Sequence, residues 1–231
     1  MKRFWTDATV EKAADGWRIL LDGKNVRTPA RAELVVPGEA LAEAIAGEWN
    51  AVEGEIDPRA MPLTGFANAA IDRVAPDRAA FAANLGKYAE ADLACYRAEG
   101  PQGLVDLQAG EWDALLGWAR RRYDVNFAVT TGVTHVAQPA ATVERLSHEV
   151  AALDPFRLAG LSPMVTAGGS LVAALAVLDG AWDAAKAWDA VSVDDAWQRE
   201  RWGSDDEAEK ALEARRYDFL AGARFLALVT A

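Results

Sequence analysis

The sequence predicts an α+β protein in which a small, β-rich antiparallel N-terminal domain precedes a larger all-helical C-terminal domain. Short runs of strand-forming residues alternate with turn residues over 1–37, whereas from residue 39 onward the apolar residues recur at helical spacing. After a first predicted helix, the segment 56–63 contains Pro58 and Pro62, which break regular structure, and we place the domain boundary there. We therefore expect two domains, residues 1–60 and residues 61–231.

Turn signals define the predicted strands. Residues 17–21 form an apolar run that stops at Asp22-Gly23, a pair typical of tight hairpins. Two shorter candidate strands, 25–28 and 33–36, each end at a proline, and residues 2–10 form a further candidate. A meander of this size is not stable alone, so we expect it to pack on the helices that follow.

Helical periodicity accounts for most of the remaining chain. Leu41, Ile45 and Trp49 share one face of a first helix, and the segment 104–123 ends in three arginines, whose charge favours a helix C-terminus. Residues 127–136 contain alternating β-branched residues, which predict a short hairpin around Thr131-Gly132. The predicted helices are 39–54, 64–74, 77–97, 104–123, 139–153, 155–166, 169–179, 181–190, 193–202 and 205–228.

Composition excludes several classes of function. The 231 residues carry a net charge of −11 with a pI near 4.7, which argues against sequence-independent nucleic-acid binding and against docking on anionic membranes. A single cysteine, Cys95, excludes an intramolecular disulfide and a four-thiolate zinc site. The most apolar run, 170–178, is far shorter than the roughly 20 residues that a bilayer requires. The N-terminus lacks the apolar stretch of a secretory signal.

Motifs for phosphate, dinucleotide or metal binding are absent from the sequence, and so is a serine nucleophile elbow. Neither His135 nor His148 has the spacing of a metal ligand, and Cys95 is expected on the buried face of a helix. The residues therefore show no evident active site and favour a binding protein over an enzyme. Two alternatives stay open: a hydrolase that uses carboxylates from the C-terminal half, with His135, and a generic protein-binding adaptor.

Tryptophan and acidic residues are both in excess. Most of the nine tryptophans fit a core that bridges helices, but Trp197 and Trp202 flank a charged segment, a combination that protein interfaces favour. Nine acidic residues lie between Asp194 and Asp218. Some fit helix N-termini, where anions favour the dipole, and an ordinary solvated face explains the rest. The residues alone favour a binding protein.

Several short segments, in order, span nearly the whole chain: LLDGKNVRTP at 20–29, AGEWN at 46–50, IDP at 56–58, MPLT at 61–64 with Asn68, CYR at 95–97, LVDLQ at 104–108, WD at 112–113 and WQRERWG at 197–203. Together they resemble the assembly chaperones of F-type ATP synthase, the family that binds the free α subunit of the catalytic head. Asn50 stands where the family more often has aspartate.

The resemblance implies a chaperone that holds the unassembled α subunit, prevents its aggregation and hands it over to the β subunit. It implies no cofactor or metal. It places the functionally important acidic position on Asp194 or its neighbour Asp195, with Trp197, Glu200 and Trp202 as further contacts. Trp49 is expected to anchor the fold first and to contact the partner second. Relatives in eukaryotes act in the mitochondrial matrix; because this N-terminus begins directly at the domain, we expect a bacterial, cytoplasmic protein.

Overall fold

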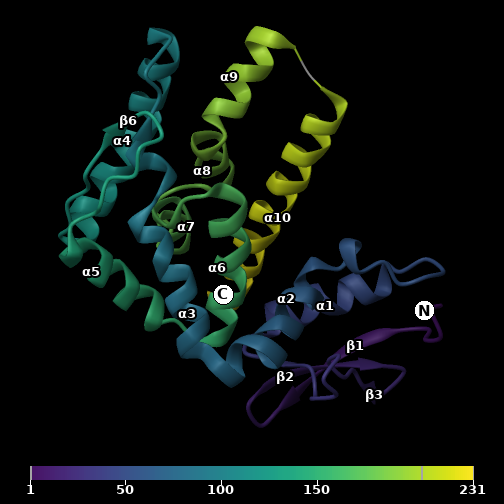
Figure 1. Ribbon diagram of the computed structural model, residues 1–231. Coiled ribbons are helices and arrows are strands. Elements are labelled where there is room, and N and C mark those ends of the chain that lie inside the picture. The colour runs from purple at the N-terminus through teal and green to yellow at the C-terminus, as the bar shows by residue number, and fades with distance from the viewer. Residues whose placement is uncertain (1, 204, 231) are drawn as a thin grey trace. The chain divides into compact units, whose positions relative to one another are not determined.

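A computed structural model of the chain, which describes residues 2–203 and 205–230, contains two compact units (Figure 1). The first unit contains the residues up to Arg78, together with Asp154–Gly160 and the end of the chain from Arg224. The second unit contains Ala79–Leu153 and Leu161–Ala223. A β-rich N-terminal region followed by a helical remainder confirms the predicted fold class. The predicted domain boundary between residues 60 and 61 stays a prediction.

An antiparallel sheet forms the start of the first unit. Strands β1 (Ala8–Ala13) and β2 (Gly16–Leu21) pair along their full length as a hairpin, and β2 also pairs with β3 (Lys24–Asn25) and β4 (Val35–Val36). Strand β2 is therefore central in the sheet. Gly16 is required at the hairpin turn, because its φ is +152° and a Cβ there would collide with the Val36 carbonyl.

Two helices cover this sheet and each other. Helix α1 (Glu39–Asn50) packs on β1 and β2, and α2 (Pro62–Ala69) packs on α1. Glu48 of α1 caps α2: its two carboxylate oxygens accept hydrogen bonds from the backbone N–H of Leu63 and of Thr64, both at 2.8 Å. These bonds satisfy donors that the start of a helix leaves without partners, so the AGEWN and MPLT segments meet for a structural reason.

The core of the first unit joins both ends of the sequence. Ile19, Leu41 and Ile45 are fully buried in it, and so is Phe225 near the C-terminus. The Phe225 ring lies edge-on to Phe66, with centroids 5.6 Å apart. The last turns of α10 (Asp206–Thr230) therefore complete the core that the N-terminal sheet begins.

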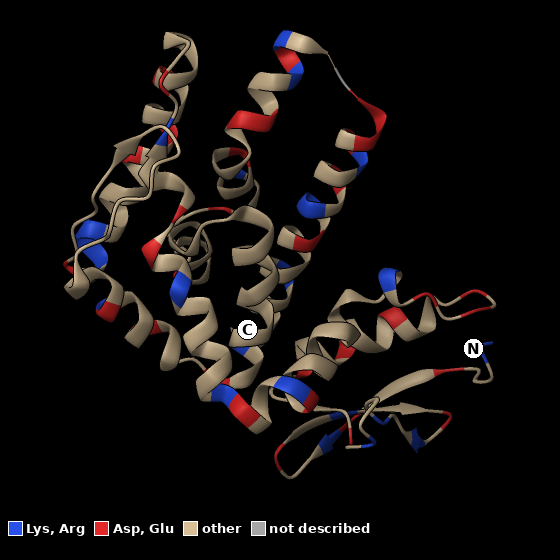
Figure 2. Cartoon of the chain, in the orientation of Figure 1, with Lys and Arg blue, Asp and Glu red and all other residues tan. Residues whose placement is uncertain are grey.

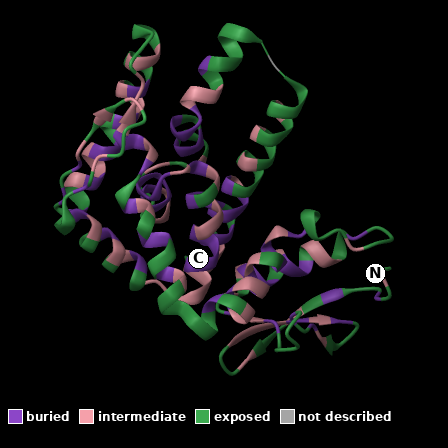
Figure 3. Cartoon of the chain, in the orientation of Figure 1, coloured by how far each residue is buried: buried purple, intermediate pink, exposed green. Residues whose placement is uncertain are grey.

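The second unit is helical, and its core centres on a short helix. Helix α7 (Leu171–Leu178) is buried from Leu171 to Ala176, which explains why its sequence is apolar all round (Figure 3). Ser170 caps it by accepting from the Ala173 N–H at 3.0 Å. The other helices with residues in this unit are α3 (Arg78–Gly86), α4 (Gln102–Tyr123), α5 (Ala140–Ala151), α6 (Pro155–Gly168), α8 (Ala184–Val191), α9 (Val193–Trp202) and α10.

Two sequence predictions about this unit are wrong. The predicted helix 77–97 ends at Gly86 and is followed by two 3₁₀ turns, Lys87–Glu90 and Leu93–Cys95. The Asp92 side chain turns inward and caps the second turn by accepting from the Ala94 N–H at 3.1 Å. The predicted hairpin 127–136 is not formed: β6 (Thr130–Thr131) pairs in parallel with β5 (Tyr96–Arg97), more than 30 residues earlier in the chain. Strand propensity was present, but the pairing partner is distant in sequence.

Candidate partner-binding site

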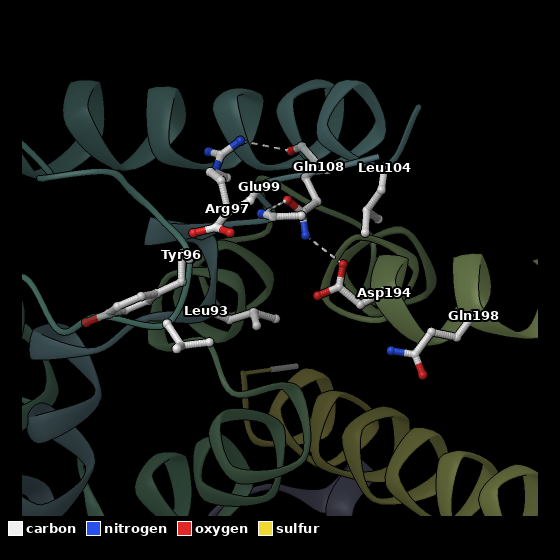
Figure 4. Close-up of a pocket in the computed structure, with 12 residues that line it drawn as sticks. Leu93, Tyr96, Arg97, Glu99, Leu104, Gln108, Asp194 and Gln198 are labelled. Carbon is white, nitrogen blue, oxygen red and sulfur yellow. Dashed lines mark hydrogen bonds between the residues drawn. The ribbon is translucent and has the colours of Figure 1, made fainter. Parts of the chain in front are cut away.

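A cavity of about 690 Å³ opens in the second unit between α4, α9 and the segment that follows Asp92 (Figure 4). Helix α4 contributes Leu104 and Gln108, and helix α9 contributes Asp194 and Gln198. The remaining lining comes from Leu93, Tyr96–Gly100, Gly132 and Val133. Three regions far apart in the sequence, 93–108, 132–133 and 194–198, therefore meet around one opening.

Helix α9 is held against α4 by its first tryptophan. The Trp197 side chain is 9% exposed, and its ring fills the space beside Gly103, where an added Cβ would lie 2.8 Å from a ring carbon. The Arg201 guanidinium lies over the Trp197 ring, 4.7 Å from its centroid. This packing fixes the first turn of α9, and with it Asp194, at the edge of the cavity.

Gln108 connects the walls of the cavity. Its side chain is 2% exposed, and its amide oxygen accepts from the Ala98 N–H at 2.7 Å while its amide nitrogen donates to Asp194 Oδ1 at 2.7 Å (Figure 4). A buried amide with both ends satisfied has one preferred orientation, since a flip would place donor against donor. Asp194 is therefore positioned by a residue 86 positions away in the sequence.

Arg97 stabilises the same wall from behind. Its guanidinium donates to the carbonyls of Ala94 and Gln108, both at 3.1 Å, and to Asp113 Oδ1 at 2.8 Å. It also lies over the Trp112 ring, 5.2 Å from the centroid. The only cation in the lining is thus fully engaged by the protein's own groups, within the part of the chain that the structure describes.

Two carboxylates of the lining have no cation bound to them in the described structure. Asp194 accepts its hydrogen bond from the neutral Gln108, and Glu99 forms no ion pair. Further acidic side chains lie in the first turn of α10, whereas the last turn of α9 carries both signs, with Glu200 between Arg199 and Arg201 (Figure 2). The cavity therefore presents negative charge beside apolar walls, an arrangement suited to a basic partner.

Asp92 anchors the segment that carries one wall. It is fully buried, and it accepts from Ser170 Oγ at 2.8 Å and from the Val172 N–H at 2.9 Å. Burial raises the pKa of the Asp92 carboxyl, while these hydrogen bonds act in the opposite direction. Burial also raises the pKa of the neighbouring Cys95 thiol to about 12, so this thiol stays protonated and unreactive.

The residues predicted to contact the partner differ in burial and in their neighbours. Asp194 is half-buried at the cavity, whereas Asp195 is turned toward Arg215, with 3.3 Å between carboxylate and guanidinium. Glu200 is exposed, and Trp202 is 78% exposed at the end of α9. Trp197 is packed inside, as described above.

Trp49 belongs to the first unit, where it packs against the core. Its ring is half-buried and lies edge-on to Trp5, with centroids 5.1 Å apart, and its carbonyl accepts from Trp5 Nε1. This placement fits the anchoring role that the sequence analysis gave it first. Eight of the nine tryptophans are buried or half-buried, which leaves Trp202 as the exposed one.

Three lining residues were missed by sequence reasoning. Glu99 precedes a Gly-Pro pair and gives no motif signal, and Val133, 99% exposed, lies in the segment expected to be a hairpin. Gln108 ends the LVDLQ segment, but sequence spacing cannot show that it meets Asp194. The sequence shows the chemical type of each residue but not its position in three dimensions.

The described residues give little support to an enzyme. The Tyr96 hydroxyl lies 3.1 Å from His135 Nδ1, and no group of histidine, cysteine, aspartate and glutamate side chains in 2–203 and 205–230 could hold a metal ion. Asp92, the carboxyl group whose pKa is raised, is enclosed in the core and out of reach of a substrate. No helix in the same residues combines the length and apolarity needed to cross a membrane.

Comparison with known proteins gives a consistent result. The family model described as ATP12 chaperone protein matches residues 2–120. The mitochondrial protein atp12 of Schizosaccharomyces pombe is 24% identical over 221 residues, which cover 90% of this chain and 76% of that protein. The crystal structure of Atp12 from Paracoccus denitrificans is 45% identical, with a TM-score of 0.94 over 99% of this chain and 98% of that one.

An aspartate-to-lysine mutant of the same Paracoccus protein is 44% identical and also has a TM-score of 0.94, covering 99% of this chain and 97% of that one. The matched family confirms the predicted resemblance and the expectation of a chaperone, not an enzyme. Its relatives come from bacteria and from mitochondria. This chain belongs to the ATP12 chaperone family, the ATP synthase assembly chaperones that its motifs predict.

Proposed function

We propose that this ATP12-family chaperone holds the free α subunit of F-type ATP synthase against the cavity of its second unit, with Asp194 as a central contact, until the β subunit replaces it. One observation carries the proposal. Residues of the CYR, LVDLQ and WQRERWG segments line the same cavity, and Gln108 of LVDLQ binds Ala98, which follows CYR, and Asp194, which precedes WQRERWG.

The character of the surface fits a temporary holder. An unassembled subunit exposes apolar area that would otherwise self-associate, and a chaperone must cover that area without binding permanently. The cavity combines apolar Leu93, Leu104 and Val133 with polar Gln198 and acidic Asp194. A moderately polar interface of this kind releases its partner more readily than a large apolar one.

The remaining predicted contact residues have different roles in this proposal. Trp202 and Glu200 are exposed on α9 and extend the contact surface beyond the cavity. Trp197 acts from inside by holding α9 in place, and Asp195 is occupied by Arg215. Trp49 contributes to the stability of the first unit. We propose that the protein acts in the cytoplasm of a bacterium, as its bacterial relatives support.

The test is a refolding assay with two substitutions at Asp194. Denatured α subunit is diluted into buffer with and without this protein, light scattering is followed, and the mixture is separated by size exclusion. The wild-type protein is expected to suppress scattering and to elute with the α subunit. Asp194→Lys should weaken binding at least about tenfold, since it places like charge against a basic partner.

Asp194→Asn is the matched variant, because its amide oxygen still accepts from Gln108 and only the charge is lost. Asp194→Lys is expected to cost about 1–2 kcal/mol of stability through the unpaired Gln108. The Paracoccus relative has the same TM-score to this chain with and without an aspartate-to-lysine exchange, so such a change is compatible with the fold. Wild-type affinity in both folded variants would remove Asp194 from the mechanism.

The same assay separates the two alternatives. An adaptor for another protein would neither suppress scattering nor bind the α subunit. A hydrolase would require an accessible carboxyl group with a raised pKa, and Asp92 is buried. The α-subunit chaperone is therefore the function that the geometry supports best.

A further inference from the structure

We propose that the cavity receives a basic segment of the α subunit, in which lysine or arginine side chains flanked by apolar residues bind Glu99 as well as Asp194. This inference rests on the proposed function and names the chemistry that the site recognises. This proposal makes Glu99 a second contact residue. Glu99 lies outside the family-like motifs, and its sequence neighbours do not mark it as a binding residue.

Charge balance around the cavity is the first argument. Glu99 and Asp194 come from different segments, the 97–100 stretch and the first turn of α9, and Figure 4 shows both among the lining side chains. Arg97 is the basic residue nearest to Glu99 in the sequence, but its guanidinium is bound to Asp113 and to two carbonyls and lies over the Trp112 ring. The protein therefore leaves the negative charge of its own cavity without a cation, and a partner can supply one.

The apolar walls are the second argument. Leu93 and Leu104 are half-buried, and Val133 is 99% exposed at the rim. Lysine and arginine side chains carry long apolar stems that pack on such walls while the charged end reaches a carboxylate. A cavity of about 690 Å³ has the size of pockets that enclose small ligands, so it suits a few side chains of a segment and not a folded domain.

The position of Glu99 is the third argument. Its carboxylate lies against Gly132, where an added Cβ would come within 2.8 Å of Glu99 Oε1. Gly132 has a φ of +79°, a conformation that favours glycine in any case. The glycine therefore provides the turn after β6 and also the space in which the Glu99 side chain lies.

The first experiment measures affinity for purified α subunit by calorimetry, with three single variants. Glu99→Gln removes the charge and keeps the size, Glu99→Asp keeps the charge, and Glu144→Gln on α5 is the matched control. Glu144 is exposed, does not line the cavity and forms no ion pair in the described structure.

Glu99→Gln should bind about five- to tenfold more weakly than wild type at low salt, whereas Glu99→Asp and Glu144→Gln should stay within about twofold. At 0.5 M salt the difference should shrink, because screening weakens exposed charge pairs. Affinity of Glu99→Gln equal to that of Glu144→Gln would overturn the inference. If Asp194→Asn still weakened binding, the proposed function would stand; if Asp194→Asn also bound normally, the proposed function would fail as well.

The second experiment identifies the occupant directly. Overlapping peptides that cover the α subunit are tested for competition with the α subunit, against wild type and Glu99→Gln. The competing peptides are expected to contain lysine or arginine beside apolar residues and to lose potency against Glu99→Gln. Competition by neutral or acidic peptides alone would overturn the inference.

Discussion

The two units use their family-like segments in different ways. In the first unit several polar side chains of these segments are bound to other groups of the protein, either backbone or side chain. Glu48 caps α2, Asn50 forms two hydrogen bonds of 2.8 Å with the backbone of Ala8, and the Thr28 hydroxyl donates to Asp72 at 2.7 Å. These segments are explained by the fold, and they leave little free hydrogen-bonding capacity for a partner.

In the second unit the corresponding segments surround an open cavity. Gln108 uses its amide to position Asp194, whose second carboxylate oxygen accepts no hydrogen bond in the described structure. Glu99 is equally free of a cation. The comparison shows that a shared motif is not by itself a binding site: what distinguishes the two units is whether the motif's polar atoms are satisfied internally or buried. Trp49 Nε1 and Asn68 Oδ1 of the first unit have no hydrogen-bond partner but are buried, whereas Asp194 and Glu99 line an open cavity.

The largest effect should follow from a charge placed in the first unit. Trp49→Arg replaces the half-buried indole that packs on Trp5 with a guanidinium, and the lost packing together with a partly buried charge costs about 3 kcal/mol. Thermal and urea unfolding followed by circular dichroism should show this loss. Trp49→Phe is the control, which keeps an apolar ring and should lose less.

A Trp49→Arg protein with wild-type thermal stability would contradict the assignment of Trp49 to the core. It would also break the comparison, because a motif residue of the first unit would then be free to contact a partner. Retained stability combined with weak α-subunit binding would make Trp49 an interface residue first.

A medium effect is expected at Asp92, the buried support of the cavity wall. Asp92→Asn keeps one acceptor oxygen but places an amide N–H₂ against a backbone donor such as Val172, which should cost about 1–3 kcal/mol. Urea unfolding at neutral pH measures this loss. If the substitution also weakens α-subunit binding, the wall that carries Leu93–Gly100 depends on Asp92.

Asp92 also predicts a pH dependence. Because its pKa is raised in the folded chain above the ordinary 3.8, the folded state binds more protons than the unfolded state between these two pKa values. The contribution of Asp92 to stability should therefore fall as the pH rises from about 4 through its raised pKa, and Asp92→Asn should lack this fall. A stability difference between wild type and variant that stays constant across this range, or grows with pH, would contradict the prediction.

The sequence predicted some of this architecture well and missed other parts for identifiable reasons. Helices such as α4 and α9 and the β2–β3 turn at Asp22-Gly23 depend on periodicity and turn residues that are local in the chain, and their approximate positions were predicted. The β5–β6 pairing and the inward turn at Asp92 depend on distant segments, and local patterns cannot show them. The missed features all involve partners from different parts of the chain.

The candidate site divides in the same way. The family resemblance pointed to Asp194 or Asp195, but the two adjacent aspartates could not be told apart by spacing. The structure provides a physical difference: Asp194 lines the cavity and Asp195 is paired with Arg215. Glu99 had no signal in the sequence, because a lone exposed glutamate is usually a solvated one.

The smallest effect is therefore expected at Asp195. Arg215 also donates to the Ala167 carbonyl at 3.1 Å and lies over the Trp188 ring, so it stays in place without its carboxylate partner. The ion pair is partly exposed, and such pairs contribute less than about 1 kcal/mol. Asp195→Asn should leave α-subunit affinity within about twofold and change unfolding free energy by about 0.5 kcal/mol, measured beside Asp194→Asn. If Asp195→Asn weakened binding more than Asp194→Asn did, satisfied polar groups would be contacts too, and internal satisfaction would no longer separate structural motif residues from binding ones.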